Sequence, residues 1–592
     1  MSARVFDPAT LAVIQNATRQ IVDEMDLALE KAAFNPVMSE ARDRANGIYD
    51  PQTGDIVAQG DTGLPIFVGV MQYAVKSAIE AYPDLEEGDV VILNDPYCGG
   101  THLMDVKLVR PFHYKGKRFA FLANCGHWTD IGGNVPGGFG VKATEIIQEG
   151  IRIPPALICR KGVLQEDLLK ILLANMRLPE ERRGDLQAQF AALNVGEARL
   201  RALLDKYGDT EVAAYTAELR TRSERQMRAH ITAIPDGTYG FSAQIDSDGI
   251  VLEPITVALQ LTVRGDEMIL DFSDSSPPVR GPLNASISAT FAAVFAALKH
   301  VFPEVPINAG IFAPVTLIAP ETTFLNAKFP RAVSGSSAEV SLRVVDAVFG
   351  ALAQAIPDRV PAACFGSVAS FTISGHDTQR ASPYIMFRFS GGGFGGHPTC
   401  DGLTNGNAPI SAARTSPIEL LEQLYPLHFR YYRIRQDSGG AGYNRGGCGV
   451  EFDVTLTNGN AVSSVLGDRG IYPPYGLHGG LSAALAEVEF TVDGVSQIPL
   501  HVTKEEGVAM RPGDTARLAT PGGGGWGDPL TREPARILRD VIDGFVSAGV
   551  ALRDYGVHLT IGPGGLAVDE AETAQERRRR TDDTAGIGKG AA

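Results

Sequence analysis

Residues 105–128 read DVKLVRPFHYKGKRFAFLANCGHW, and this pattern predicts a β-hairpin. Apolar residues dominate both sides of a tight turn centred on Gly116, which is typical of two paired strands. In an antiparallel hairpin, residues equally far from the turn centre face each other. Gly116 lies midway between Asp105 and His127, so we expect these two residues to be paired, with Cβ atoms roughly 5 Å apart.

A second histidine, His102, precedes the first strand in the stretch NDPYCGGTHLMD at 94–105. Two imidazoles and a carboxylate at one end of a hairpin suit Zn, Mn or Fe and leave room for water. The alternative is that His102, Asp105 and His127 are solvated residues at a strand end, but the shared register favours a metal site. Cys125 points to the same face and is interpreted as a small core residue rather than a further ligand.

The 592 residues allow several hydrophobic cores, and the order of helix and strand patterns predicts a multidomain α+β protein. We expect a helical and mixed-sheet N-terminal domain at 1–234 and an α+β middle domain at 235–415. A β-rich C-terminal domain is predicted at 416–565, followed by a polar, mobile tail at 566–592.

Helix signals are clearest in the first two regions. Asp7 is a predicted N-cap, and the helix after it should end before Asn35 and Pro36. Further helices are predicted near 287–302 and 337–356. The 66 glycines cluster in runs such as SGGGFGGHP and TPGGGGWGDP, which predict sharp turns or close approaches between backbones.

Charge and composition exclude several classes of protein. The chain has 53 basic and 69 acidic residues and a formal charge of −16, which disfavours nucleic acid or an anionic membrane as partner. The N-terminus lacks a signal-peptide pattern, and the most apolar stretch, ATFAAVFAALKHVF, is too short to span a bilayer. Six scattered cysteines without a CxxC indicate a reducing compartment, so we expect a cytoplasmic protein.

Nucleotide-binding motifs are missing from the sequence. Nothing fits GxxxxGK[ST], and no GxGxxG follows a strand and opens a helix. A GxSxG nucleophile elbow is also missing. If the reaction needs nucleotide energy, another chain must supply it.

The sequence resembles the hydantoinase B / 5-oxoprolinase family along nearly its whole length. The matching blocks include ILNDPYCGGTHLMDVKLVRP, ATEIIQEGIRIPP, LANMRLPEERRGDLQAQ, DFSDSSPPVRGPLNA, GGGFGGHPTCDG and RQDSGGAGYNRGGCGV. The resemblance implies a subunit of an ATP-dependent hydrolase of cyclic amides such as hydantoins, 5-oxoproline or lactams. It also implies a hydantoinase A-like partner subunit, which binds the ATP.

The same resemblance implies a set of metal ligands. Matching positions are Asp43 in SEARDRANG, His102 and Asp105 in GTHLMD, and His127 in NCGHWTD. Asp43 is therefore added to the three residues that the hairpin indicates. Many relatives read AHHAD where this chain reads GHWTD, so Trp128 replaces a histidine, which points to a bulkier or more apolar substrate.

Other acidic residues match family positions. Asp130, in HWTDIGG, is the catalytic candidate, either deprotonating the water or orienting it from outside the ligand sphere. Glu339 and Asp401 lie in glycine-rich blocks and are interpreted as capping or turn residues.

A cyclic amide is a poor electrophile, so the expected mechanism has two parts. The partner phosphorylates the amide oxygen, and water activated by the metal in this chain then opens the ring. Two alternatives remain open on the sequence. One is a subunit of a ketone carboxylase of the acetone or acetophenone type, and the other is a non-catalytic assembly subunit with a structural metal.

Overall fold

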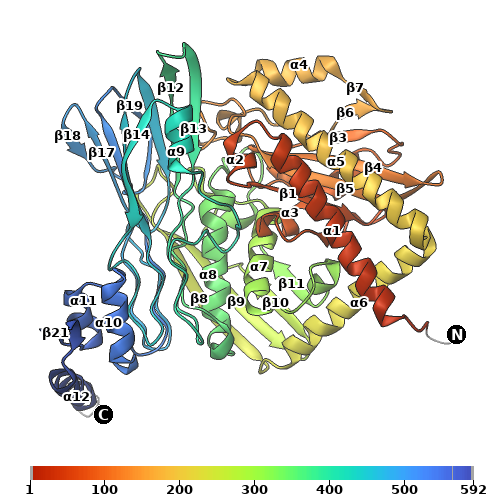
Figure 1. Ribbon diagram of the computed structural model, residues 1–592. Coiled ribbons are helices and arrows are strands. Elements are labelled where there is room, and N and C mark those ends of the chain that lie inside the picture. The colour runs from red at the N-terminus through yellow and green to blue at the C-terminus, as the bar shows by residue number, and fades with distance from the viewer. Residues whose placement is uncertain (1–3, 563, 588–592) are drawn as a thin grey trace.

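The computed structural model describes residues 4–562 and 564–587 (Figure 1). Helices alternate with two sheets in the first part of the chain, and strands dominate after it. The sheet of the N-terminal region is wholly antiparallel and not mixed as predicted, whereas the second sheet contains one parallel pair. The predicted multidomain α+β fold class is confirmed. Among the described residues, no helix is both long enough and apolar enough to cross a membrane.

The first sheet has seven strands in the order β2-β1-β5-β4-β3-β6-β7, and every neighbouring pair is antiparallel. The long hairpin β4–β5 lies at its centre. The strands are β1 (Arg44–Tyr49), β2 (Ile56–Gln59), β3 (Val90–Leu93), β4 (Asp105–Tyr114), β5 (Lys117–His127), β6 (Ala156–Arg160) and β7 (Val163–Leu164).

Long helices pack on this sheet. α1 is capped by Asp7, whose Oδ2 accepts a hydrogen bond of 2.8 Å from the backbone N–H of Thr10, as the sequence predicts. α1 lies along α5 and contacts β1, while α5 contacts β4 and β5 (Figure 1). The helices of this region are α1 (Pro8–Ala32), α2 (Pro36–Ser39), α3 (Pro65–Ala81), α4 (Glu166–Ala174), α5 (Pro179–Tyr207) and α6 (Asp209–Thr232).

The hairpin β4–β5 has the predicted register at its far end, because Asp105 pairs with His127. Near the turn the pairing is offset by one residue, since Tyr114 pairs with Lys117. The connection is therefore a two-residue turn and is not centred on Gly116 as predicted. With this turn alone, Asp105 would face a different residue of β5, and His127 would point to the other face of the sheet.

A β-bulge corrects the offset. Lys115 and Gly116 form the turn with φ values of 52° and 74°, as a type I′ hairpin turn requires. The register then shifts, because Phe112 pairs with Ala120 whereas His113 pairs with Arg118, so β5 takes up one extra residue there. The pairing at the far end of the hairpin depends on this bulge as much as on the turn.

The middle of the chain forms a four-stranded sheet in the order β11-β10-β9-β8, and α8 packs on β8 and β9. Helices α7 and α8 confirm the two helices that the sequence predicts in this region. The elements are β8 (Gly237–Ile245), β9 (Ile255–Arg264), β10 (Glu267–Asp271), β11 (Val315–Ile318), α7 (Ile287–Val301) and α8 (Ser341–Leu352).

Two further sheets share an apolar core that includes Phe371, Phe429 and Phe452. Their strand orders are β13-β12-β16-β19 and β14-β15-β20-β17-β18. Strands β12 and β13 precede residue 416, so the predicted boundary at 415 does not separate the sheets. The strands are β12 (Ser370–Asp377), β13 (Ser382–Arg388), β14 (Leu427–Ile434), β15 (Val450–Leu456), β16 (Ala461–Leu466), β17 (Glu487–Val492), β18 (Val495–Gln497), β19 (Lys504–Met510) and β20 (Thr515–Ala519); helix α9 (Ile418–Leu424) precedes β14.

The glycine-rich runs pack against one another, backbone on backbone. The N–H of Gly523 donates to the carbonyl of Gly447 at 3.0 Å, and the N–H of Gly440 donates to the carbonyl of Gly523 at 2.8 Å. A Cβ atom on Gly446 would lie 1.7 Å from the Gly523 oxygen, so no larger residue fits there. The predicted close approach of backbones is confirmed.

The last elements are α10 (Pro534–Ile542), α11 (Ala548–Tyr555), β21 (Leu559–Gly562), β22 (Gly565–Val568) and α12 (Glu570–Ile587). Most of the segment predicted to be a mobile tail thus contains a strand and a helix, while 588–592 lie outside the described residues. The arginine run of α12 packs back on the chain. Arg577 donates to the Tyr555 carbonyl at 2.9 Å, and Arg580 donates to the Leu552 carbonyl at 2.9 Å, which satisfies the C-terminal end of α11.

Candidate metal centre

Three of the predicted ligands converge at the end of the β4–β5 hairpin. Asp105 is the first residue of β4, His127 is the last residue of β5, and His102 lies in the turn before β4. Candidate ligand atoms of these three residues all lie within 4.8 Å of one another. Asp105 stands between the two imidazoles, with Oδ2 3.2 Å from His102 Nε2 and Oδ1 3.3 Å from His127 Nδ1.

Asp43 lies at the edge of this cluster. Its Oδ2 is 3.6 Å from His127 Nδ1, and the His127 N–H donates to the Asp43 carbonyl at 3.1 Å. The turn after α2 brings Asp43 to this position, with Arg42 in the left-handed region at φ 63°. Asp43 lines the same cavity as the other three residues, and it approaches His127 rather than Asp105.

Burial and neighbouring charges strongly affect the ionisation of His102 and Asp105. Burial lowers the pKa of His102 to about 4, so its imidazole is neutral at neutral pH, which is the form that binds metals. Burial alone would raise the pKa of Asp105, but the neighbouring His102, His127 and Lys107 outweigh it and hold the pKa well below its usual range. Asp105 is therefore a carboxylate under all ordinary conditions.

Asp43 and His127 influence each other's ionisation. Burial raises the pKa of Asp43 to about 7, and the negative charge of Asp105 adds to this effect. Burial opposes a charge on His127, but Asp43 and Asp105 outweigh it and raise the pKa of the imidazole. A bound cation would compete with protonation of both residues.

Neighbouring groups hold the Asp105 carboxylate in place. The hydroxyl of Thr101 donates a hydrogen bond to Asp105 Oδ2, and the Lys107 ammonium donates to the Asp105 backbone carbonyl at 3.0 Å. Thr101 and Lys107 are both fully buried. Groups of this kind orient metal-ligating carboxylates and tune their basicity.

The cluster lines a small cavity with room for about 50 Å³. Phe139 and Phe387 stack on each other with ring centroids 5.2 Å apart, and the ring of Phe387 stacks on His127 at 5.3 Å. These apolar rings limit access of water to one side of the cluster. The cavity is lined by Asp43, Leu64, Ile66, Phe67, His102, Asp105, His127, Phe139, Ser337, Ala338, Val368, Ser370, Phe387, Phe389, Asn407, Ile410 and Ser411.

The residues fit a divalent metal. His102 Nδ1 and His127 Nε2 are buried, and neither atom has a hydrogen-bond partner among the described residues. A buried polar atom without a hydrogen-bond partner destabilises a fold, and a bound ligand or ion can remove this cost. Two imidazoles with one or two carboxylates are the nitrogen and oxygen donors preferred by Zn, Mn and Fe.

Asp130 and Trp128 lie elsewhere. Neither residue is among those described as lining the cavity. Both carboxylate oxygens of Asp130 accept hydrogen bonds from Arg177, at 2.7 Å from its N–H and 2.9 Å from its guanidinium. Trp128 is fully buried and donates to Gln189 Oε1 at 3.0 Å. Trp128 thus packs in the core against α5, and Asp130 is paired with Arg177 rather than with one of the predicted metal ligands.

Glu339 and Asp401 also lie outside the cavity lining among the described residues. Glu339 belongs to a π-helical turn, Ser336–Val340, and accepts from the Val368 N–H at 3.2 Å. Asp401 accepts from Arg532 at 2.6 and 2.9 Å and so holds the C-terminal helices on the glycine-rich core. Both residues bind backbone or neighbouring side chains, which agrees with their interpretation as structural residues.

Several site residues escape sequence reasoning. Lys107 could have been found, because it lies two residues after Asp105 on the same strand face. Thr101 has no such signal. Phe139 and Phe387 reach the cavity from a loop and from β13, which lie far apart in sequence, so only the tertiary fold brings them together.

Loss of the Thr101 hydroxyl should weaken metal binding. We expect Thr101→Val to lower metal affinity roughly 10- to 100-fold, because Asp105 loses the donor that orients its carboxylate. Competition with a chromogenic chelator measures the change. Thr316→Val, on the exposed side of β11, is the matched control. Equal affinities in the two variants would contradict the orienting role of Thr101.

Fold and site together define a multidomain α+β protein with a candidate metal centre of the histidine and carboxylate type. Residues 7–529 match the family described as hydantoinase B/oxoprolinase. The match covers well over half of the chain, which therefore belongs to this family.

The relatives include components of multisubunit enzymes. The beta chain of the caprolactamase from Pseudomonas jessenii is 34% identical over 96% of this chain and 99% of its own length. The B-type component of a putative D-/L-hydantoinase from Pseudomonas sp. (strain NS671) is 29% identical over 94% of this chain and 96% of its own length.

Solved structures give the same picture. The ATP-dependent caprolactamase from Pseudomonas jessenii superposes with a TM-score of 0.87 at 33% identity, covering 97% of this chain and 100% of that one. A chain of nucleotide-free acetone carboxylase superposes with a TM-score of 0.89 over 98% of this chain and 84% of that one. At 22% identity, the second likeness shows the shared fold.

Proposed function

We propose that this chain is the ring-opening subunit of an ATP-dependent hydrolase of cyclic amides. The observation that carries the proposal is the convergence of His102, Asp105 and His127 at one cavity, in a chain related over nearly its full length to a caprolactamase subunit. The C–N bond of a lactam, hydantoin or related ring would be broken here.

The chemistry requires two kinds of site. An amide becomes a good electrophile once its oxygen is phosphorylated, and this chain has no phosphate-binding loop motif. We place ATP and the phosphorylation step on a partner subunit of the hydantoinase A type. This chain then receives the activated amide.

Each residue of the site has a role in this scheme. Asp43, His102, Asp105 and His127 would hold a divalent Zn, Mn or Fe ion, which supplies Lewis-acid chemistry and lowers the pKa of water when bound. Thr101 holds the Asp105 carboxylate in its orientation. The stacked rings beside His127 keep the site apolar on one side and strengthen its electrostatic interactions. Asp130 is bound to Arg177, and we assign it no catalytic role.

The division of labour can be tested by purification. We expect the single chain to retain metal and to show no turnover, and its complex with the partner subunit to hydrolyse a lactam or hydantoin while consuming ATP. Metal analysis and product assays on both preparations measure this. Turnover by the single chain without ATP would contradict the scheme.

Ketone carboxylation is the second candidate. The acetone carboxylase chain shares the fold, and an activated ketone could occupy the same cavity. A screen of the complex with cyclic amides and with ketones plus bicarbonate separates the two reactions, since only carboxylation consumes bicarbonate.

A further inference from the structure

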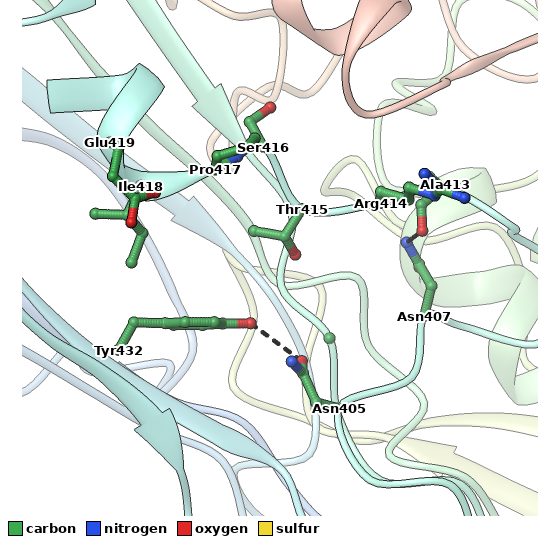
Figure 2. Close-up of a pocket in the computed structure, with 11 residues that line it drawn as sticks. Asn405, Asn407, Ala413, Arg414, Thr415, Ser416, Pro417, Ile418, Glu419 and Tyr432 are labelled. Atoms are coloured by element: carbon green, nitrogen blue, oxygen red, sulfur yellow. Dashed lines mark hydrogen bonds between the residues drawn. The ribbon is translucent and has the colours of Figure 1, made fainter. Parts of the chain in front are cut away.

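A second and larger cavity adjoins the candidate metal cavity, and Figure 2 shows the residues that line it. It measures about 620 Å³ and shares Asn407 in its lining with the metal cavity. Residues 405–418, here called the partition segment, form the wall between the two. Ile410 and Ser411 line the metal cavity, while Thr415 and Ser416 line the larger one.

Backbone contacts hold the partition segment in place. The side-chain amide of Asn407 donates to the Ala413 carbonyl at 2.8 Å, which closes the turn between them (Figure 2). The N–H of Arg414 donates to the carbonyl of Ala41 at 2.8 Å, two residues before the proposed ligand Asp43. The wall is thus tied to the loop that carries one of the metal ligands.

The lining of the larger cavity is mixed in polarity and includes one cation that is available to a ligand. Arg414 is exposed, and no described residue forms an ion pair or side-chain hydrogen bond with its guanidinium. Tyr432 donates its hydroxyl proton to Asn405 Oδ1 at 3.1 Å on the opposite side (Figure 2). Glu419 is the single carboxylate among the described lining residues.

A buried arginine lies behind Tyr432. Arg388 is 3% exposed, and its Cζ is 4.6 Å from the ring centroid of Tyr432 and 4.3 Å from that of Phe452. All three guanidinium nitrogens lack hydrogen-bond partners among the described residues. A buried cation without a carboxylate partner is costly, and its field favours an anion in the adjoining cavity.

Size favours use of both cavities by one ligand. Small-molecule sites usually measure about 300–1,000 Å³. The metal cavity is far below this range, whereas the larger cavity lies within it. A ligand at the metal that also carries a phosphoryl group needs space outside the metal cavity, and the larger cavity is the adjoining space at Asn407.

We propose that the larger cavity binds the phosphoryl group of the activated substrate. Arg414 provides the direct contact, since a guanidinium donates two parallel hydrogen bonds to phosphate oxygens, and Arg388 adds positive potential from behind Tyr432. The ligand of this site is a small phosphorylated amide, and the cavity binds the two negative charges of its phosphoryl group. This inference rests on the proposed function, because it assumes that the activated ring reaches the metal cavity.

Binding of inorganic phosphate to the full chain tests the site without any turnover. We expect Arg414→Gln to weaken phosphate binding roughly 10- to 100-fold, as removal of a charged hydrogen-bond donor does. Arg264→Gln, at the exposed end of β9, is the matched control and should leave the affinity unchanged. Isothermal titration calorimetry measures the phosphate affinity of both variants, on the full chain with and without metal.

The outcomes are distinct. Phosphate binding that is unaffected by Arg414→Gln, or that occurs only through the metal, would overturn the site. In the complex, Arg414→Gln should raise the KM for the amide at least about 10-fold with a much smaller change in kcat. The reason is that Arg414 contacts the substrate at a point remote from the bond that breaks. If phosphate binds as expected but the complex hydrolyses no amide, the proposed function fails and the anion site stands.

Discussion

His127→Ala should abolish metal binding and turnover while the chain stays folded. Loss of a group that merely orients a ligand costs roughly 10- to 100-fold in metal affinity, so loss of a direct ligand should cost at least about 100-fold. His127 also bridges Asp105 and Asp43, at 3.3 and 3.6 Å from Nδ1. Without it, these two carboxylates repel each other with no imidazole between them.

Metal analysis of the purified variant and ATP-dependent product assays on its complex measure these effects. His428→Ala is the matched control, because His428 is exposed on β14, outside the lining of the metal cavity, and should retain both metal and activity. The near-ultraviolet circular dichroism of His127→Ala should resemble that of the parent chain. A variant that unfolds, or loses cooperative thermal unfolding, would instead support the alternative of a structural metal in a non-catalytic subunit.

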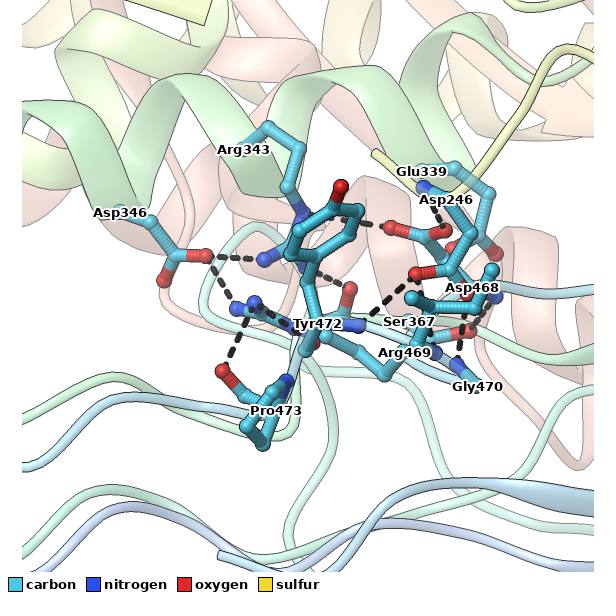
Figure 3. Close-up of polar contacts among 12 residues, drawn as sticks. Asp246, Glu339, Arg343, Asp346, Ser367, Asp468, Arg469, Gly470, Tyr472 and Pro473 are labelled. Atoms are coloured by element: carbon cyan, nitrogen blue, oxygen red, sulfur yellow. Dashed lines mark hydrogen bonds and ion pairs between the residues drawn. The ribbon is translucent and has the colours of Figure 1, made fainter. Parts of the chain in front are cut away.

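The second large effect concerns a buried cluster of charges between α8 and the loop after β16 (Figure 3). Arg343 and Asp346 of α8 pair with each other, and Arg469 pairs with the same Asp346. Asp468 accepts from Lys504 at 3.1 Å and lies 3.6 Å from Arg343 Nε. All five side chains are almost fully buried.

Two more carboxyl groups complete the cluster (Figure 3). Asp246, at the end of β8, accepts hydrogen bonds from the backbone N–H groups of Gly470, Ile471 and Tyr472. Burial, with a further contribution from the neighbouring Asp468 charge, raises the pKa of Glu339 to about 8. Glu339 is therefore mostly protonated at neutral pH, and three buried carboxylates remain to balance three buried cations.

Arg343→Ala should be strongly destabilising. Removing one member of a buried ionic network leaves uncompensated charge, which typically costs about 3–5 kcal/mol. Asp346 and Asp468 would each lose a cation, and the cluster would carry excess negative charge. The midpoint of urea unfolding and the thermal unfolding temperature should both fall.

An exposed pair provides the control. Arg539 is 74% exposed on α10 and forms an ion pair of 2.9 Å with Asp543. Arg539→Ala should change stability by less than about 0.5 kcal/mol, since exposed pairs contribute little. A change below about 1 kcal/mol in the free energy of unfolding for Arg343→Ala would contradict a stabilising role of the buried cluster.

Local patterns predicted much of the hairpin and part of the site. The apolar runs within residues 105–127, the glycine at the turn and the spacing of His102 from Asp105 indicate which side chains share one strand end. These inferences succeed because backbone hydrogen bonding allows few registers over a short loop. Even here, the pairing of Asp105 with His127 requires a bulge that the sequence pattern did not show.

Sequence patterns were thus sufficient for the fold class, for the first helix with its Asp7 cap, and for the three residues at the hairpin end. Only the tertiary structure decided that Asp130 turns to Arg177, that Phe387 covers His127, and that Arg414 lines a second cavity beside the first. The reason is physical. Short-range hydrogen bonding follows from spacing along the chain, whereas contacts between distant segments depend on how every element packs at once.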